Sequence, residues 1–321
     1  MSTARSRAHA KERSKKLRRA LVLSIVAIAA SALLGLLVYS SLNPPKTAND
    51  NSGSQQQPVT APQKIALVDQ LSAEWPDPTF DQTAQIILNQ TGLKVDYYPS
   101  EDVTVDFYRN LPSQNYRLII FRVHSTGDTA AQGAPPWVVF FTSENYSKTA
   151  HVEEQMDARL VYVKFTDSPQ MYFGITPVFV TQSMLGKFNH TMIIAMGCEG
   201  LKYDSMATAF IQKGARSFIS WNGSVLENYT DNATLFLLRH LVTEKQTIEE
   251  AVNETMNQVG PDPTYKSILM FFPYHVGEDF LLTDATVTTP TVRTATEANR
   301  RMKKLRENIG RFGFETAWAK Y

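Results

Sequence analysis

Short apolar runs alternate with segments of helical periodicity along most of this chain. The apolar runs predict strands at residues 65–68, 93–98, 117–123, 192–196, 217–221 and 267–272. Apolar positions repeating every three or four residues predict helices at residues 80–89, 103–111, 178–188, 205–213, 234–242 and 247–259. Strands that are apolar throughout are typical of a mostly parallel sheet with helices on both faces. We therefore expect an α/β fold of three layers with about six strands.

The stretch between residues 137 and 163 departs from this alternation. It contains β-branched and aromatic runs at 138–142 and 160–163, separated by turn residues. This pattern predicts hairpins outside the main sheet.

Residues 20–42 contain no charged side chain and are rich in Leu, Ile, Val and Ala. Roughly 20 apolar residues span a bilayer as a helix, so this stretch predicts a transmembrane anchor. Eight Lys and Arg residues precede it, against the single acid Glu12. Basic flanks stay in the cytoplasm, which predicts a single-pass cell-membrane protein with everything after Leu42 extracytoplasmic. A signal peptide cleaved near Ser40 is the alternative, but the apolar run is long for a signal core.

The chain thus divides into five predicted parts. Residues 1–19 form a basic cytoplasmic segment, 20–42 the anchor, 43–63 a polar flexible stalk, and 64–288 the folded extracytoplasmic domain. Residues 289–321 form a basic amphipathic extension. Three roles stay open for this extension: docking on the domain, contact with anionic lipid, or a solvated helix.

Composition narrows the possible partners. Beyond residue 19, acidic residues outnumber basic ones, so no nucleic-acid partner is expected. No metal-binding or phosphate-loop pattern is present, so we expect no metal and no cofactor. An extracytoplasmic location also agrees with seven Asn-x-Ser/Thr acceptor sites for glycans, at Asn89, Asn145, Asn189, Asn222, Asn228, Asn232 and Asn253.

Two predicted strands end in residues that carry chemistry. Cys198, the only cysteine, follows the strand at 192–196, and His124 follows the strand at 117–123. The carboxyl ends of parallel strands meet at one edge of a sheet, so a nucleophile and a base are expected together there. The alternative is that Cys198 is a small buried hydrophobe and His124 an ordinary loop histidine. Glu199 is either a solvated loop acid or a residue that orients the site.

The segments 118–125 and 192–200, each a hydrophobic strand followed by His or by Gly-Cys, resemble the caspase–hemoglobinase fold of cysteine peptidases (clan CD). The segment 207–221 is most similar to the CHAT and caspase-like domains, and the resemblance spans residues 65–282. It implies that Cys198 is the nucleophile, that His124 is the proton shuttle, and that the backbone N–H groups of Ser125 and Cys198 form the oxyanion hole. The family usually has glycine where this chain has Ser125.

The resemblance also implies a substrate pocket built from strand ends. Its candidate residues in this chain are Asp69, Ser220, Trp221, Asn222 and Asp231. Acids in such a pocket favour cleavage after Arg or Lys by charge pairing, and we expect no Lys or Arg of this chain at the same strand ends. The alternative for both acids is a turn residue or a helix cap.

Three functions follow as hypotheses. The first is a membrane-anchored extracytoplasmic cysteine endopeptidase with a Cys-His dyad, acting on a peptide or protein substrate. The second is a catalytically inactive caspase-like binding module of the cell envelope. The third is an α/β domain that binds a solute or the cell wall, in which the pairing of Cys198 with His124 is coincidental.

Overall fold

The computed structural model describes residues 64–128, 137–165, 168–274 and 282, all within one unit that spans Val59–Tyr321. The predicted cytoplasmic segment, anchor and stalk lie outside the described residues, as does the C-terminal extension. Among the residues that are described, no helix is both long and apolar enough to cross a membrane.

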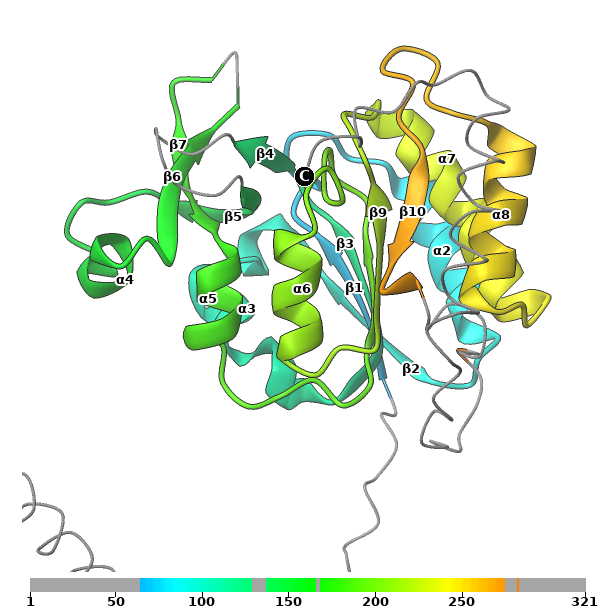
Figure 1. Ribbon diagram of the computed structural model, residues 1–321, viewed down its shortest axis with the longest axis horizontal. Coiled ribbons are helices and arrows are strands. Elements are labelled where there is room, and N and C mark those ends of the chain that lie inside the picture. The colour runs from blue at the N-terminus through cyan, green and yellow to red at the C-terminus, as the bar shows by residue number, and fades with distance from the viewer. Residues whose placement is uncertain (1–63, 129–136, 166–167, 275–281, 283–321) are drawn as a thin grey trace, which may run out of the picture. The chain divides into compact units, whose positions relative to one another are not determined.

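A six-stranded sheet forms the centre of the fold (Figure 1). Its strands stand in the order β10-β9-β8-β3-β1-β2. Five are mutually parallel and β10 runs antiparallel on the edge, which confirms the predicted mostly parallel sheet. The strands are β1 (Lys64–Asp69), β2 (Lys94–Tyr98), β3 (Tyr116–Arg122), β8 (Met192–Ala195), β9 (Ser217–Trp221) and β10 (Leu269–Phe272).

Helices cover both faces of this sheet (Figure 1). One face carries α3 (Val105–Asn110), α5 (Pro177–Gln182) and α6 (Ser205–Gln212). The other carries α2 (Pro78–Asn89), α7 (Glu227–Leu238) and α8 (Ile248–Val259). Short helical segments are η1 (Ser100–Asp102), η2 (Leu111–Gln114), α4 (Val152–Met156) and the π-helical turn η3 (Arg239–Thr243).

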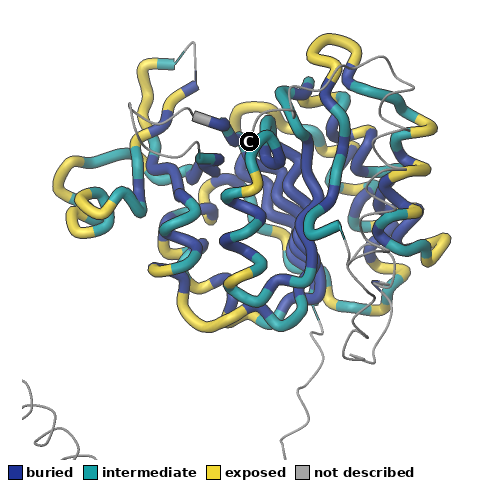
Figure 2. Tube along the Cα trace, in the orientation of Figure 1, coloured by how far each residue is buried: buried dark blue, intermediate teal, exposed yellow. Residues whose placement is uncertain are grey.

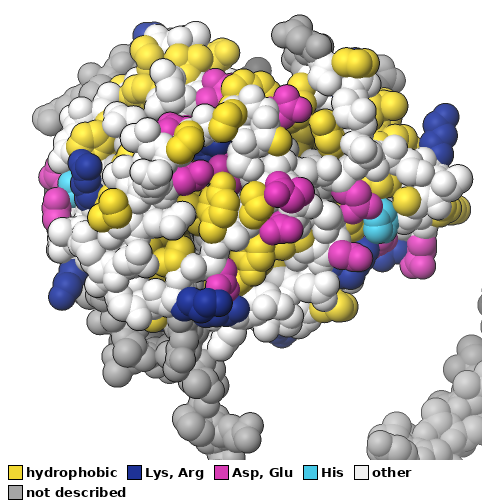
Figure 3. Space-filling view, turned by 180° about the vertical axis from the view of Figure 1, so that it is seen from behind, with side chains coloured by type: hydrophobic (Ala, Val, Ile, Leu, Met, Phe, Trp, Pro, Cys, Tyr) yellow, Lys and Arg dark blue, Asp and Glu magenta, His cyan; other side chains and the backbone are white. Residues whose placement is uncertain are grey.

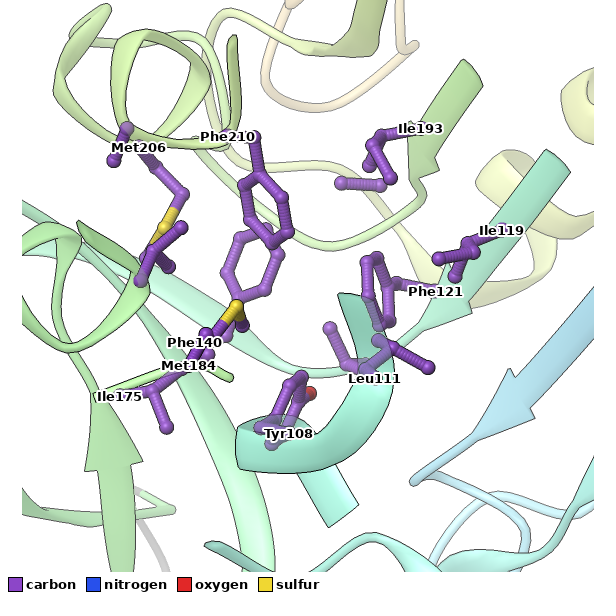
Figure 4. Packing of buried hydrophobic residues seen from close by; sticks show 14 of the residues in the cluster. Tyr108, Leu111, Ile119, Phe121, Phe140, Ile175, Met184, Ile193, Met206 and Phe210 are labelled. Carbon is purple, nitrogen blue, oxygen red and sulfur yellow. The ribbon is translucent and has the colours of Figure 1, made fainter. Parts of the chain in front are cut away.

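The main sheet has one large hydrophobic cluster on each face, and a third, smaller cluster contains Val139, Phe141, Val163 and Phe165. Successive strand residues point to opposite faces, so Ile119 and Phe121 of β3 join one cluster while Leu118 and Ile120 join the other. Phe121 packs with Phe210 of α6, as Figure 4 shows. The four inner strands β1, β3, β8 and β9 are buried almost along their whole length (Figure 2), which explains why they are largely apolar in sequence.

Local sequence signals set several helix ends. Thr247 and Glu250 form a reciprocal capping box at the start of α8. Gly214 follows α6 with φ of 106°, a conformation that favours glycine, and a Cβ there would overlap the carbonyl oxygen of Phe188. Two predicted helices differ in extent. The helix expected at 178–188 ends at Gln182. The helix expected at 234–242 begins earlier, at Glu227, and its start was missed because polar side chains in the first turns hide the apolar periodicity.

A second sheet lies beside the first. Its four antiparallel strands stand in the order β4-β5-β7-β6 and confirm the predicted hairpins. They are β4 (Ser125–Asp128), β5 (Trp137–Asn145), β6 (Leu160–Lys164) and β7 (Met171–Ile175). Only Val123 and His124 separate β3 from β4, so the chain passes from one sheet to the other at His124.

Candidate active site

Cys198 and His124 follow two neighbouring strands of the parallel sheet. Phe121 of β3 is paired in register with Ala195 of β8, and His124 and Cys198 each lie three residues beyond that pair. Adjacent strands are about 4.8 Å apart, so the two residues leave the same edge of the sheet side by side. Both line one cavity of about 20 Å³, which has room for about one water molecule. The structure therefore brings the predicted nucleophile and base to one site.

The half-buried thiol of Cys198 is held by the loop that follows β9. The N–H of Val225 lies 3.4 Å from Sγ, and the thiol lies 3.5 Å from the carbonyl oxygen of the same residue. Burial raises the pKa of the Cys198 thiol, the Val225 N–H opposes this, and the Glu227 carboxylate adds to the rise. The resting side chain is thus a neutral thiol rather than a thiolate.

His124 sits in an aromatic enclosure. Phe141 and Phe165 meet its ring edge-on at centroid distances of 4.7 and 5.0 Å, and Trp75 stacks at 6.5 Å. Burial lowers the pKa of His124 and Glu227 counteracts the shift, so the imidazole is neutral near pH 7 and able to accept a proton.

No hydrogen bond joins His124 to Cys198 in the described structure, and neither ring nitrogen of His124 has a hydrogen-bond partner there. Aromatic packing orients the ring instead. The backbone is fixed separately, because Gln70 Oε1 accepts the His124 N–H at 3.0 Å.

Two hydrogen bonds join β4 to the loop after β8 that contains Cys198 and Glu199, which we call the cysteine loop. The Ser125 hydroxyl donates to the Cys198 carbonyl oxygen at 2.6 Å. The Glu199 carboxylate accepts the Gly127 N–H at 2.7 Å and also pairs with Lys202 at 2.9 Å. Glu199 therefore joins the two loops rather than standing free as a solvated acid.

Gly197 allows the two loops to approach closely. A Cβ at this position would overlap both the carbonyl oxygen of Val123 and the hydroxyl of Ser125. Only glycine leaves room for this contact between the ends of β3 and β8.

The two backbone N–H groups that were predicted to bind an oxyanion, those of Ser125 and Cys198, lie where β4 meets the loop after β8. The Phe141 N–H donates to the His124 carbonyl at 2.9 Å. Hydrogen-bonded and non-hydrogen-bonded pairs alternate along an antiparallel ladder, so the next pair, Ser125 with Phe140, is a non-hydrogen-bonded one. The Ser125 N–H is thus outside the ladder, and its nitrogen lies 3.2 Å from where a Cβ on Gly197 would stand. The Cys198 N–H has no acceptor within the described residues. A serine at position 125 has the same backbone donor that a glycine there would have.

We expect Ser125→Ala to lower the free energy of unfolding by about 1–2 kcal/mol, because the Cys198 carbonyl loses the hydrogen bond from the buried Ser125 hydroxyl. Alkylation of Cys198 by iodoacetamide should also change in rate, since the cysteine loop loses one of its two ties to β4. Urea denaturation and alkylation kinetics measure the two effects. The matched control is Ser147→Ala, at a hydroxyl remote from the site. Wild-type stability and reactivity in Ser125→Ala would contradict the role of this bond.

The two acids Asp69 and Asp231 do lie together at the strand ends, but both bind Arg122. The guanidinium donates to Asp69 at 2.9 Å and, through two nitrogens, to Asp231 at 2.9 Å each. Arg122 is only 2% exposed. The premise that no Lys or Arg lies at these strand ends was therefore wrong. Both acids are already paired and offer no free carboxylate to a substrate.

A further acid adjoins this cluster. The Tyr97 hydroxyl bridges Asp69 at 3.3 Å and Asp81 at 3.2 Å. Burial, together with the neighbouring charge of Asp69, raises the pKa of Asp81 to about 6. Asp69 and Asp231 thus share the guanidinium of Arg122, whereas Asp81 joins the cluster through Tyr97 and adds a further negative charge above that pH.

The predicted pocket residues Ser220, Trp221 and Asn222 bond to the chain itself. Ser220 is fully buried and donates to the Ala195 carbonyl at 2.6 Å, and Trp221, also fully buried, donates through Nε1 to Thr230. Asn222 accepts the Ile268 N–H at 2.9 Å. The cavity wall is formed a few residues further on, by Val225 and Glu227.

Sequence reasoning missed four residues that shape the site: Gln70, Trp75, Val225 and Glu227. Gln70 had a usable signal, because it directly follows a strand whose last residue, Asp69, was already a candidate. The other three lie in loops or at a helix start, where no periodic pattern places them.

Within the described residues, no group of three or more His, Cys, Asp or Glu side chains is arranged to hold a metal ion. No model of a known protein family matches the chain, and no curated protein sequence matches it either.

Proposed function

We propose that this chain is a cysteine peptidase of the caspase–hemoglobinase fold that hydrolyses a peptide or protein substrate. One observation carries the proposal: Cys198 and His124 leave the carboxyl ends of neighbouring parallel strands and line the same cavity. The two N–H groups of Ser125 and Cys198 add the anion-binding element that acyl transfer requires.

The residues present support a complete hydrolytic cycle. His124 accepts the thiol proton as the sulfur of Cys198 attacks the scissile carbonyl carbon, and the oxyanion is bound by the Ser125 and Cys198 N–H groups. The C–N bond breaks, the imidazolium protonates the leaving amine, and the acyl group remains on sulfur as a thioester. Water then attacks the thioester while His124 takes its proton. The acid is released and the proton returns to sulfur.

A neutral thiol and a neutral imidazole favour general-base activation over a preformed ion pair. Burial raises the pKa of Cys198 and lowers that of His124, so neither group is charged in the resting state. Proton transfer then accompanies the attack, and His124 has to be deprotonated for it to occur.

The second candidate function is a catalytically inactive binding module of the cell envelope. It is favoured by the bonding of Sγ to Val225 instead of His124 and by a cavity of only about 20 Å³. A solute-binding domain with a coincidental Cys-His pairing is less well supported, because both residues share one cavity.

The location outside the cytoplasm is part of the proposal. It rests on the apolar run at 20–42 with its basic flank, together with the exposure of the glycan acceptor sites. Asn89, Asn145, Asn228, Asn232 and Asn253 are exposed, and Asn189 and Asn222 are half-buried. On the face that Figure 3 shows, Lys and Arg side chains stand apart from one another among acidic ones, so this face offers no basic track for nucleic acid.

A peptide-library assay with the full chain tests the function. We expect hydrolysis that disappears when iodoacetamide alkylates Cys198, the only cysteine of the chain, and that increases with pH as His124 loses its proton. The control is a sample alkylated in the same way and then mixed with fresh enzyme, which should recover activity. Absence of hydrolysis under all conditions, with the thiol intact, would favour the binding module.

A further inference from the structure

Two charged side chains line the cavity beside Cys198, and only one of them is paired. Arg122 binds Asp69, Asp231 and the carbonyl oxygen of Trp75 through four hydrogen bonds. Glu227, the first residue of α7, is exposed and has no ion-pair or hydrogen-bond partner in the described part of the chain. Its carboxylate is therefore available to a ligand.

The remaining charges near the sulfur are also negative on balance. Asp262 is fully buried, and its carboxylate accepts the N–H groups of Leu226, Thr264 and Tyr265, so it is fixed just behind the Val225 loop. Its charge, like those of Glu227 and Glu199, acts on Cys198. Lys202 neutralises Glu199, whereas no cation of the described residues pairs with Asp262 or Glu227.

We propose that Glu227 selects substrates that carry a positive charge beside the scissile bond. This inference rests on the proposed function only in naming the ligand a substrate, because the attraction of cations to the Cys198 site needs no catalysis. It assigns to Glu227 the preference for a basic group that Asp69 and Asp231, both bound to Arg122, do not provide.

The size of the cavity limits how the cation is bound. A volume of about 20 Å³ does not admit a lysine or arginine side chain. The positive group therefore lies at the rim, against the exposed Glu227 carboxylate, rather than in a deep pocket. A basic side chain before the cut and the free α-ammonium of a substrate's N-terminal residue both supply this chemistry.

The first experiment compares two thiol reagents of opposite charge on the full chain. The cationic 2-(trimethylammonium)ethyl and the anionic 2-sulfonatoethyl methanethiosulfonates each form a disulfide with Cys198 and release methanesulfinate. No other cysteine competes. We expect the ratio of cationic to anionic labelling rates to fall about threefold to tenfold in Glu227→Gln and further in Glu227→Lys. Glu254→Gln, an exposed acid on α8, is the matched control and should leave the ratio unchanged.

The second experiment uses peptides and separates the two sources of charge. One arm compares N-acetylated peptides with Lys or norleucine before the cut, and the other compares free with acetylated N-termini. If Glu227→Gln slows cleavage of the Lys peptide alone, the site binds a basic side chain. If it slows cleavage only of peptides with a free N-terminus, the site binds the α-ammonium group.

A ratio of labelling rates that is the same in wild type, Glu227→Gln and Glu227→Lys would overturn the proposal. If the ratio shifts as expected while no peptide is cleaved, the cation site stands and the peptidase function fails.

Discussion

Replacing Cys198 with alanine is expected to abolish peptide hydrolysis while changing the free energy of unfolding by no more than about 1 kcal/mol. The thiol is half-buried, and its contacts to Val225 are long, so truncation removes little packing. The covalent step, by contrast, has no substitute nucleophile. We expect His124→Asn to lower turnover by about 10²- to 10⁴-fold, the usual contribution of a general base. Cleavage kinetics and urea denaturation, run on the same preparations, measure the two effects.

The matched control is His151→Asn, because His151 pairs with Glu144 away from the cavity. It should retain full turnover. If Cys198→Ala cleaved peptides as fast as the wild type, the hydrolysis would have to be assigned to another residue or to a contaminating protein.

Arg122→Gln is expected to lower the free energy of unfolding by about 3–5 kcal/mol, the usual cost of removing one member of a buried ion pair. The substitution leaves Asp69 and Asp231, which are 0% and 4% exposed, facing one another without a countercharge. It also removes the donor to the Trp75 carbonyl. Chemical denaturation followed by Trp fluorescence or circular dichroism measures the change.

A triple variant tests whether the unpaired charges cause the loss of stability in Arg122→Gln. Arg122→Met combined with Asp69→Asn and Asp231→Asn removes the unpaired charges as well as the cation, and should recover a large part of the loss. Arg159→Gln, at an arginine that pairs with Glu153 and Asp157 near the surface, should have a much smaller effect. If the triple variant were as unstable as Arg122→Gln alone, shape rather than charge would explain the destabilisation.

The main sheet was predictable because its inner strands are buried on both faces and are therefore apolar at nearly every position. Each predicted strand overlaps an observed one, and the edge placement of β2 and β10 is consistent with their partly exposed positions. The meeting of His124 and Cys198 at one edge followed from the rule that parallel strands end together. The register of Phe121 with Ala195 confirms that edge, whereas the direct approach of the two side chains stays a prediction.

Side-chain partners far apart in sequence could not be predicted. Arg122 stands in an apolar strand, and its acids are 53 and 109 residues away, so no local pattern pairs them. Glu227 was missed because the polar start of α7 lacks apolar periodicity. The expected helix was therefore placed seven residues too late. The bond from Ser125 to Cys198 could not be predicted either, because it depends on how two loops meet in space.

His124 stands where the chain leaves the parallel sheet and enters the antiparallel one, whereas Cys198 lies in the loop that follows β8 of the parallel sheet. Only two residues separate β3 from β4, so little chain is available to absorb a shift of one sheet against the other. The bonds from Ser125 to Cys198 and from Glu199 to Gly127 resist such a shift at the cysteine loop. The position of the imidazole relative to the sulfur therefore depends on how the two sheets are held together, and these two bonds hold them together next to Cys198.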